Sequence, residues 1–334
     1  MKYFIGLFIL CLLGACTNPE TKVGQETFSA SFRGVAVAEG GALWASGTGG
    51  EVIFAVHPDS AFKSKKVKSD SLADFRSIAL SKPGVAHVVA IANPARIYKT
   101  SNFGKTWKQT YFLDTAGIFL DGIAFFDHQE GLVFGDPIDN LLVLLKTYDG
   151  GETWSRLKPN NFPNAFPGEG GFAASGTSIT IKGNTVWIGT GGPSGARVYR
   201  SRDRGITWEV FNTPLSVGEG CGVFSLAFAD EQNGVAVGGC YIDSTSRERT
   251  SAFTTDGGAT WQLSKISVSG YRSVVVKTKK GYYAWGRTGM DFSNDGGITW
   301  ENKLNPGYFA GGEVKPDKLL MVGRKGKIKI IDQP

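Results

Sequence analysis

An all-β fold, a seven-bladed β-propeller with four-stranded antiparallel blades, is predicted for this 334-residue chain by three observations. First, an eight-residue pattern, Ser/Thr-x-Asp/Asn-x-Gly-x-Thr-Trp, occurs five times. Second, its copies recur roughly every 40–50 residues, the length of one propeller blade. Third, apolar residues alternate along short segments joined by tight turns, as in the matching segments Ile123–Gly135 and Leu226–Gly238. Such alternation predicts antiparallel hairpins.

Each copy of the pattern has the composition of a turn that leads into a strand. The Asp or Asn oxygen can accept hydrogen bonds from backbone N–H groups a few residues on, Gly adopts positive φ at low cost, and Trp supplies a large apolar surface. The copies are Thr100–Trp107, Thr147–Trp154, Ser201–Trp208, Thr254–Trp261 and Ser293–Trp300. We expect their third residues to be structural rather than catalytic; these are Asn102, Asp149, Asp203, Asp256 and Asp295.

The chain divides into seven units on this template. They cover Phe32–Val56, Phe75–Trp107, Leu120–Trp154, Ala174–Trp208, Val223–Trp261, Tyr271–Trp300 and Phe309–Ile331. The first unit lacks the pattern and the last has only three predicted strands. We expect a strand near Thr27–Ser31 to pair with the last blade, because this would close the ring and remove an open sheet edge. The predicted propeller domain is therefore 27–334.

The N-terminus has the pattern of an export signal. Lys2 precedes an apolar run, Tyr3–Leu13, that is too short to span a bilayer but suits a secretory signal peptide. Leu13-Gly14-Ala15-Cys16 resembles the lipobox of bacterial lipoproteins, which implies that residues 1–15 are removed and that Cys16 carries the lipid. Residues 16–26 would then be a tether, and we expect an exported lipoprotein anchored to the membrane, facing the periplasm or the cell surface. An ordinary signal peptide with an incidental Cys is the alternative.

Two of the four Cys residues fall outside this signal: Cys221, just before the fifth unit, and Cys240, within it. Cys221 precedes its first predicted strand and Cys240 ends the second, so they lie at the same end of one hairpin. Because an exported protein meets an oxidising environment, we expect a disulfide here. Two free buried thiols are the alternative.

Charged residues begin the first strand of several units in the same register. Arg33, Arg76, Arg272 and Asp121 share parity with the apolar residues that follow them, and the first strand of a blade lines the central channel. We expect the three arginines to gather at one channel mouth, where guanidinium groups would suit a carboxylate or a phosphate. Bracing of the blade ends is the alternative role. Further arginines follow second strands and are expected at the same rim: Arg96, Arg197, Arg287 and Arg324.

Acidic residues are expected on the same face. The main candidates are Asp121, Asp136 and Glu169, the last within the long inter-blade stretch Pro159–Ser175. Long insertions often carry function. Two of these carboxylates would suit glycoside hydrolysis if they meet, which their spacing in the chain does not show.

Signs of other chemistry are few. The three His residues, His57, His87 and His128, are scattered, so neither a zinc site nor a Ser-His-Asp triad is expected. No phosphate-binding or dinucleotide-binding glycine motif is present. We therefore expect no metal and no cofactor. The formal net charge of +6 is compatible with an acidic protein surface or an anionic glycan, whereas nucleic acid is not expected for an exported protein. We expect a monomer.

With five patterns and seven units, the chain resembles the BNR or Asp-box repeat propellers of the sortilin and sialidase type. It looks closest to the branch of the photosystem II stability and assembly factor, whose members are seven-bladed, non-catalytic assembly proteins that use an arginine patch. The resemblance implies a lipid-anchored propeller that binds a protein or an anionic partner in the cell envelope, not an enzyme.

A glycoside hydrolase, sialidase-like or acting on neutral glycans through channel-mouth carboxylates, is the alternative function. Sialidases carry a Phe/Tyr-Arg-Ile-Pro motif near the N-terminus. The nearest match, Ala95-Arg96-Ile97-Tyr98, lacks the Pro and falls in a third strand of the second unit, which argues against sialidase activity.

Overall fold

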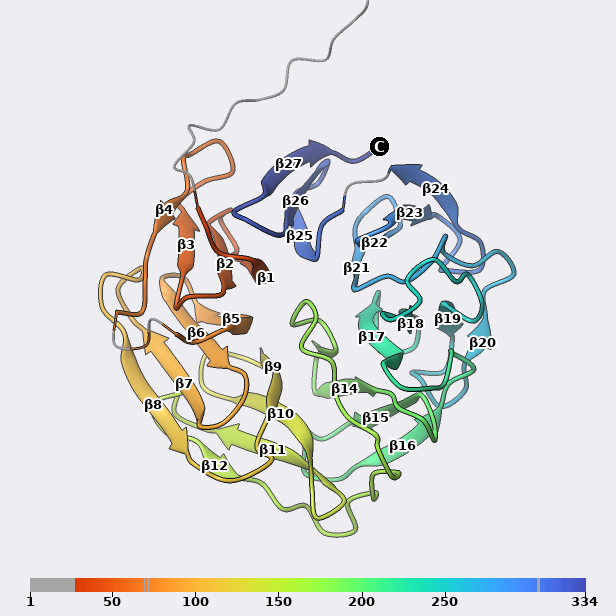
Figure 1. The fold of residues 1–334 in the computed structure, drawn as a ribbon, viewed down its shortest axis with the longest axis horizontal. Coiled ribbons are helices and arrows are strands. Elements are labelled where there is room, and N and C mark those ends of the chain that lie inside the picture. Colours follow the sequence, from red (N-terminus) through yellow and green to blue (C-terminus); the bar gives the residue numbers. More distant parts are fainter. Residues whose placement is uncertain (1–27, 69, 71, 305–306) are drawn as a thin grey trace, which may run out of the picture.

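Seven antiparallel sheets surround a central axis and form a β-propeller in the computed structural model, which describes residues 28–68, 70, 72–304 and 307–334 (Figure 1). The predicted fold class is confirmed. In each sheet the strands follow chain order from the centre to the rim, and each strand pairs with the next. No helix of the described residues is long and apolar enough to cross a membrane.

The first four blades are four-stranded. Blade 1 contains β1 (Phe32–Val37), β2 (Leu43–Gly47), β3 (Val52–Ala55) and β4 (Lys63–Ser64). Blade 2 contains β5 (Phe75–Lys82), β6 (Val85–Ala90), β7 (Ala95–Thr100) and β8 (Lys108–Leu113). Blade 3 contains β9 (Leu120–Phe125), β10 (Gly131–Ile138), β11 (Leu141–Thr147) and β12 (Ser155–Arg156). Blade 4 contains β13 (Ile179–Lys182), β14 (Thr185–Thr190), β15 (Arg197–Ser201) and β16 (Glu209–Asn212).

The remaining three blades complete the ring. Blade 5 contains β17 (Cys221–Phe228), β18 (Gly234–Cys240), β19 (Ser251–Thr254) and β20 (Gln262–Leu263). Blade 6 contains β21 (Val274–Lys277), β22 (Tyr282–Gly286), β23 (Gly289–Ser293) and β24 (Glu301–Leu304). Blade 7 contains β25 (Ala310–Lys315), β26 (Lys318–Val322) and β27 (Ile328–Asp332).

The fourth strand expected for blade 7 is not formed by residues 28–31. This segment instead crosses the end of the β26–β27 hairpin, where Gly326 N donates to Ala30 O at 2.7 Å and Phe32 N donates to Gly323 O at 3.0 Å. Thr27, the first residue of the expected strand, lies outside the described residues, as do Cys11 and Cys16. The segment therefore contacts the last blade by its backbone without extending the three-stranded sheet seen in the described residues.

Seven clusters of buried apolar side chains hold the ring together, one between each pair of neighbouring blades. The cluster between blades 7 and 1 packs Phe32 and Leu43 against Ala310 and Leu320, so the first and last blades meet through side chains. Three Trp residues on second strands are fully buried in these clusters: Trp44, Trp187 and Trp285. Such large buried areas are the main stabilising contribution to each blade contact.

The five repeated turns have the geometry that their composition predicts. In blade 3, Thr147 Oγ1 donates to Asp149 Oδ1 at 2.8 Å and accepts from Gly151 N at 2.9 Å. Asp149 Oδ1 also accepts from the backbone N–H groups of Glu152 and Thr153, at 2.9 and 3.0 Å. Partial burial raises the pKa of Asp149, but the hydrogen bonds outweigh it and lower the pKa to about 2. This carboxylate serves the turn.

A cation just before three of these turns braces the next blade. Lys99 Nζ donates to Gly150 O at 2.7 Å, Lys146 Nζ to Arg204 O at 2.7 Å, and Arg200 Nη1 to Gly257 O at 2.8 Å. Each acceptor is the fourth residue of the neighbouring turn. The turns also lie beside the hairpins that join first to second strands, as the bond from Gly150 N to Gln129 O at 2.8 Å shows. The opposite face of the ring is therefore free of them.

Candidate functional site

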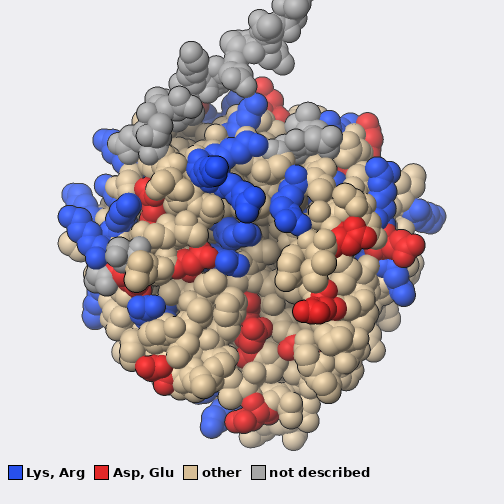
Figure 2. Space-filling model, in the orientation of Figure 1, with Lys and Arg blue, Asp and Glu red and all other residues tan. Residues whose placement is uncertain are grey.

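A cavity of about 940 Å³ opens on the face opposite the repeated turns, where first strands begin and second strands end. Arg33, Arg76, Asp121, Asp136 and Glu169 all lie in its lining. Figure 2 looks onto this face: Lys and Arg side chains gather over its upper part, and several Asp and Glu side chains lie below them. The sequence-predicted channel mouth is thus a real cavity, with basic and acidic residues on its walls.

The inter-blade stretch 159–175 forms the floor of this cavity. It lies between β12 and β13 and reaches into the centre of the ring (green, Figure 1). Ser175 Oγ donates to Ser273 O, in front of β21, at 2.7 Å, so the stretch crosses the channel from blade 4 to blade 6. Phe172 stacks on Phe224 with ring centroids 3.7 Å apart, and Phe224 meets Tyr271 edge-on at 4.8 Å. An aromatic stack therefore anchors the stretch, which we call the channel plug.

A β-bulge positions four of the side chains around the cavity. It lies at the start of the first strand in blades 1, 2, 3 and 5, where one residue has no partner on the second strand. These residues are Arg33, Arg76, Asp121 and Phe224. All four line the cavity. A bulge frees the extra residue from the ladder and turns its side chain. It also brings the backbone close to the end of the second strand, where a Cβ at Gly135 would lie 2.0 Å from Phe119 O.

Arg33 and Arg76 face the cavity together. The Arg33 guanidinium stacks on the Phe309 ring, 4.3 Å from its centroid, and makes no hydrogen bond or ion pair with another described residue. Burial lowers the pKa of Arg33, and the nearby charge of Arg76 lowers it further. Arg76 Nε donates to Asp74 Oδ2 at 2.8 Å. Two adjacent guanidinium groups, only one of which is paired, form a site that an anion would stabilise.

Arg272 does not join them. It is fully buried, and its Nε donates to Asp291 Oδ2 at 2.6 Å while Nη1 donates to Thr288 Oγ1 at 3.0 Å. It precedes β21 and is not in a bulge. Arg272 therefore braces the end of its blade, which was the alternative role that the sequence left open. Its place at the rim is taken by Arg287, an exposed residue in the cavity lining whose Nη2 donates to Tyr241 O at 2.6 Å.

Glu169 is held by an ion pair with Arg197. The side chains of both are at least 95% buried, Arg197 Nε donates to Glu169 Oε1 at 3.0 Å, and Arg197 Nη2 bonds the other oxygen. Glu169 also accepts from Thr190 Oγ1 at 2.5 Å and from Phe166 N at 2.7 Å. A carboxylate engaged on both oxygens positions the channel plug rather than offering itself to a ligand. The other two arginines expected at the rim do not contact Glu169. Arg96 forms an ion pair with Asp70 at 3.0 Å, and Arg324 lies close enough to Arg33 to lower the pKa of Arg33.

Asp121 and Asp136 form an acidic wall on blade 3. Asp121 is only 1% exposed, and neither of its oxygens has a hydrogen-bond partner among the described residues. Burial raises its pKa well above the ordinary value and neighbouring Asp136 raises it further. The charge of Arg76 opposes the rise, as does the nearby Ala173 N–H group, which does not reach hydrogen-bonding geometry with either oxygen. Asp136 Oδ1 accepts from Gly171 N at 2.8 Å, and burial raises its pKa as well. Among the described residues, no three His, Cys, Asp or Glu side chains group closely enough to hold a metal ion.

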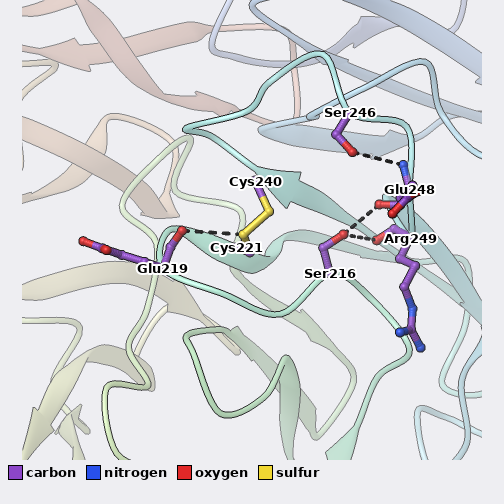
Figure 3. Close-up of a disulfide and its surroundings, with 7 residues drawn as sticks. All are labelled: Ser216, Glu219, Cys221, Cys240, Ser246, Glu248 and Arg249. Carbon is purple, nitrogen blue, oxygen red and sulfur yellow. Dashed lines mark hydrogen bonds between the residues drawn. A yellow bond between two sulfur atoms is a disulfide. The ribbon is translucent and has the colours of Figure 1, made fainter.

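A disulfide joins Cys221 to Cys240 across β17 and β18, beside this cavity (Figure 3). The two residues are directly paired in the sheet, with Cα atoms 4.0 Å apart. Glu219, whose side chain points away from the sulfur atoms in Figure 3, belongs to the cavity lining. The bond fixes the end of blade 5 where the loop 218–220 meets the cavity.

The sequence did not single out the aromatic part of the lining. Tyr241, Tyr271 and Phe309 line the cavity together with the arginines. Burial raises the pKa of Tyr271 despite the opposing charges of Arg33 and Arg287. Phe309, directly before β25, and Tyr271, directly before Arg272, occupy the same position in their repeats. Alignment of the repeats could therefore have identified both as residues of the lining.

Comparison with known proteins supports the fold. The BNR-Asp box repeat family pattern matches residues 97–110, which is one of the five copies. A search of curated protein sequences returned no match. The structure of YCF48 bound to D1 peptide superposes with a TM-score of 0.64 at 15% identity, covering 92% of this chain and 95% of that one. YCF48 from Cyanidioschyzon merolae gives 0.65 at 13% identity, covering 91% of this chain and 96% of that one.

A glycoside hydrolase is also similar. The GH74 enzyme of Niastella koreensis gives a TM-score of 0.61 at 13% identity, over 94% of this chain and 53% of the enzyme. The chain is a β-propeller, and its residues 97–110 match the BNR-Asp box repeat. At these identities the similarity shows the fold alone, so the function has to be argued from the residues that line the cavity.

Proposed function

We propose that this protein is a binding propeller whose cavity holds an anionic segment of a protein partner. The observation that carries the proposal is the pair Arg33 and Arg76, displayed by two adjacent bulges into the cavity. Arg33 is stacked on Phe309 and leaves its N–H donors without a partner among the described residues. Guanidinium groups that are partly desolvated and pre-oriented bind carboxylates more strongly than mobile surface lysines do.

The comparisons support a protein partner over a small ion. One similar structure, YCF48, is a complex with a D1 peptide. The cavity here is large enough for a peptide segment, and its lining mixes arginine with Tyr241, Tyr271 and Phe309. Aromatic and arginine side chains are the residues most enriched where protein interfaces gain their binding energy.

The test is binding of labelled octaglutamate, measured by fluorescence anisotropy at two salt concentrations, with octalysine and polygalacturonate as the comparison ligands. We expect octaglutamate to bind, and Arg33→Ala with Arg76→Ala to weaken it about tenfold or more, since charged hydrogen bonds contribute about 1.5–3 kcal/mol. The matched control is Arg202→Ala, an exposed arginine in a repeated turn on the opposite face. Equal binding by wild type and the double variant would refute the proposal. Stronger binding of polygalacturonate would make the partner a glycan.

We also propose that the propeller is tethered to a membrane of the cell envelope. The support is the leader and lipobox ending at Cys16, which lies outside the described residues. In the described fold, residue 28 enters the ring beside Gly326, on the cavity face. The prediction is that Cys16→Ser abolishes labelling with radioactive palmitate in a bacterial host. Labelling that persists in this variant would refute it.

Glycoside hydrolysis is the second candidate, and one observation favours it. Asp121 and Asp136 lie together in the cavity and both have raised pKa values, which is the property of a general acid. Against it, Glu169 is engaged by Arg197 and cannot serve as the partner carboxylate. Release of reducing sugar from xyloglucan that is lost in Asp121→Asn would establish hydrolysis, and its absence at high enzyme concentration would remove this candidate.

A further inference from the structure

We infer that the acidic wall of the cavity is a second subsite, which binds a cationic amine or guanidinium group of the same ligand that Arg33 and Arg76 hold by its carboxylate. This rests on the proposed function and deepens it: the ligand segment carries both signs of charge, and the cavity binds them on neighbouring walls, blades 1 and 2 for the carboxylate and blade 3 for the cation. The acidic wall consists of Asp121 and Asp136 on blade 3.

The first argument is positional. Asp121 occupies the bulge of blade 3 that Arg33 and Arg76 occupy in blades 1 and 2. In these three strands the bulged residue has no partner on the second strand and lies in the cavity lining. Three consecutive blades thus present two guanidinium groups and one carboxyl group to the same space.

The second argument is the unsatisfied state of Asp121. Both carboxyl oxygens are buried, and neither accepts a hydrogen bond from a described residue. Leaving a buried polar group without partners is unfavourable, so such a group in a cavity wall calls for an explanation. Asp136 is only partly buried; its Oδ1 accepts from Gly171 N, and its Oδ2 makes no hydrogen bond with a described residue. A donor with several N–H groups would satisfy the remaining oxygens of both.

The third argument concerns which cation fits. No three His, Cys, Asp or Glu side chains of the described residues group closely enough to hold a metal ion, so a dehydrated divalent ion would lack ligands. An ammonium or guanidinium group needs only two acceptors and brings its own apolar stem. The aromatic rings of Phe172 and Phe224, which line the cavity between the acidic wall and the rim of blade 5, suit such a stem.

The experiment uses three ligands of one chain length: hexanoate, hexylamine and ω-aminohexanoate. Their binding to the purified protein is measured by isothermal titration calorimetry or by ligand-observed NMR. We expect ω-aminohexanoate to bind about tenfold or more tightly than hexanoate, as a charged hydrogen bond contributes about 1.5–3 kcal/mol. Aminobutanoate and aminooctanoate then report the span between the two walls, and affinity should pass through a maximum along the series.

Variants separate the subsite from the proposed function. Asp121→Asn and Asp136→Asn should each remove the gain of the amino group while leaving hexanoate binding within about twofold. Arg33→Ala should weaken all carboxylate ligands. If hexanoate binds and is sensitive to Arg33→Ala but the amino group adds nothing, the subsite is refuted and the anion site stands. If hexanoate does not bind at all, the proposed function fails first. If Asp121→Asn weakens hexanoate as much as ω-aminohexanoate, Asp121 only supports the channel plug and the inference is overturned.

Discussion

Acid sensitivity of this propeller should depend on one buried histidine, His87. It lies on β6, fully buried, with its ring 4.5 Å from Phe125 and 6.5 Å from Trp154. Its Nε2 bonds Ser81 Oγ at 3.1 Å, while Nδ1 has no partner among the described residues. Burial lowers its pKa to about 3, and the charge of Lys99 adds to this effect while Glu152 opposes it.

The size of the effect follows from linkage. The pKa of His87 is lower in the folded state than its ordinary value of about 6.5, so as pH falls the unfolded chain takes up the proton first. The contribution is fully present above about pH 6.5 and is lost at about 1.4 kcal/mol per pH unit below it. Between pH 7 and pH 5 the loss is about 2 kcal/mol. Asp121 acts in the opposite direction, because its raised pKa favours the folded state as pH falls.

Comparing wild type with a His87 variant cancels the contribution of Asp121, because both proteins contain Asp121. The free energy of unfolding in urea is measured at pH 7, 6 and 5 for wild type and for His87→Phe, with the exposed His57→Asn as control. Phe fills a site already lined by rings but is larger, so the absolute stability of the variant is expected to change. Its stability should fall about 2 kcal/mol less than that of wild type between pH 7 and pH 5. Parallel pH curves for wild type and His87→Phe would refute the reasoning.

Three further predictions concern stability. Asp203→Ala removes the acceptor of the Ile206 and Thr207 N–H groups, at 3.0 and 2.9 Å, and should lower the free energy of unfolding in urea by about 1–3 kcal/mol. Asp203→Asn should lower it less, because Asn102 fills this position in blade 2. Lys146→Met, which removes the bonds to Arg204 O and Glu130, should cost about 1–3 kcal/mol, whereas the exposed Lys108→Met should cost under about 0.5 kcal/mol by the same measurement. Cys221→Ser with Cys240→Ser opens a bridge between residues 19 apart and should cost about 3 kcal/mol in thermal unfolding without reductant; a wild type that keeps its full stability when reduced would contradict this.

The repeated turns could be predicted in full because their chemistry is local. Asp149 reaches its partners within four residues, so the eight-residue pattern contains almost the whole hydrogen-bond network. The number of blades followed from the spacing of the same pattern. The closing strand expected near Thr27–Ser31 is not formed by the described residues 28–31, because two backbone hydrogen bonds to Gly323 and Gly326 bind the segment across the hairpin instead of along β27.

The candidate site was only partly predictable, since it depends on contacts between blades. Parity along the first strand placed Arg33, Arg76 and Asp121 at the cavity correctly. The same parity failed for Arg272, because Asp291 on β23 takes its guanidinium into the sheet. Glu169 was expected as a ligand-binding candidate on this face, and its pairing with Arg197, 28 residues away, could not be identified from spacing. The Gly residues in the second strands beside the bulges, such as Gly135, which pairs with Leu120 next to the bulged Asp121, were the one local sign of the bulges.

The bulge at the start of four first strands separates the residues that the fold constrains from the residue that faces the ligand cavity. Residues on either side of it, such as Phe75 and Ser77, pair with β6 and are buried, so they are constrained by the fold. The bulged residue itself has no ladder partner, and blades 1, 2, 3 and 5 carry arginine, arginine, aspartate and phenylalanine there. One position in each of these four blades can therefore vary in charge and size while the scaffold stays the same. A ring built this way can acquire a new ligand preference by a few substitutions, and the same positions are where a designer would begin.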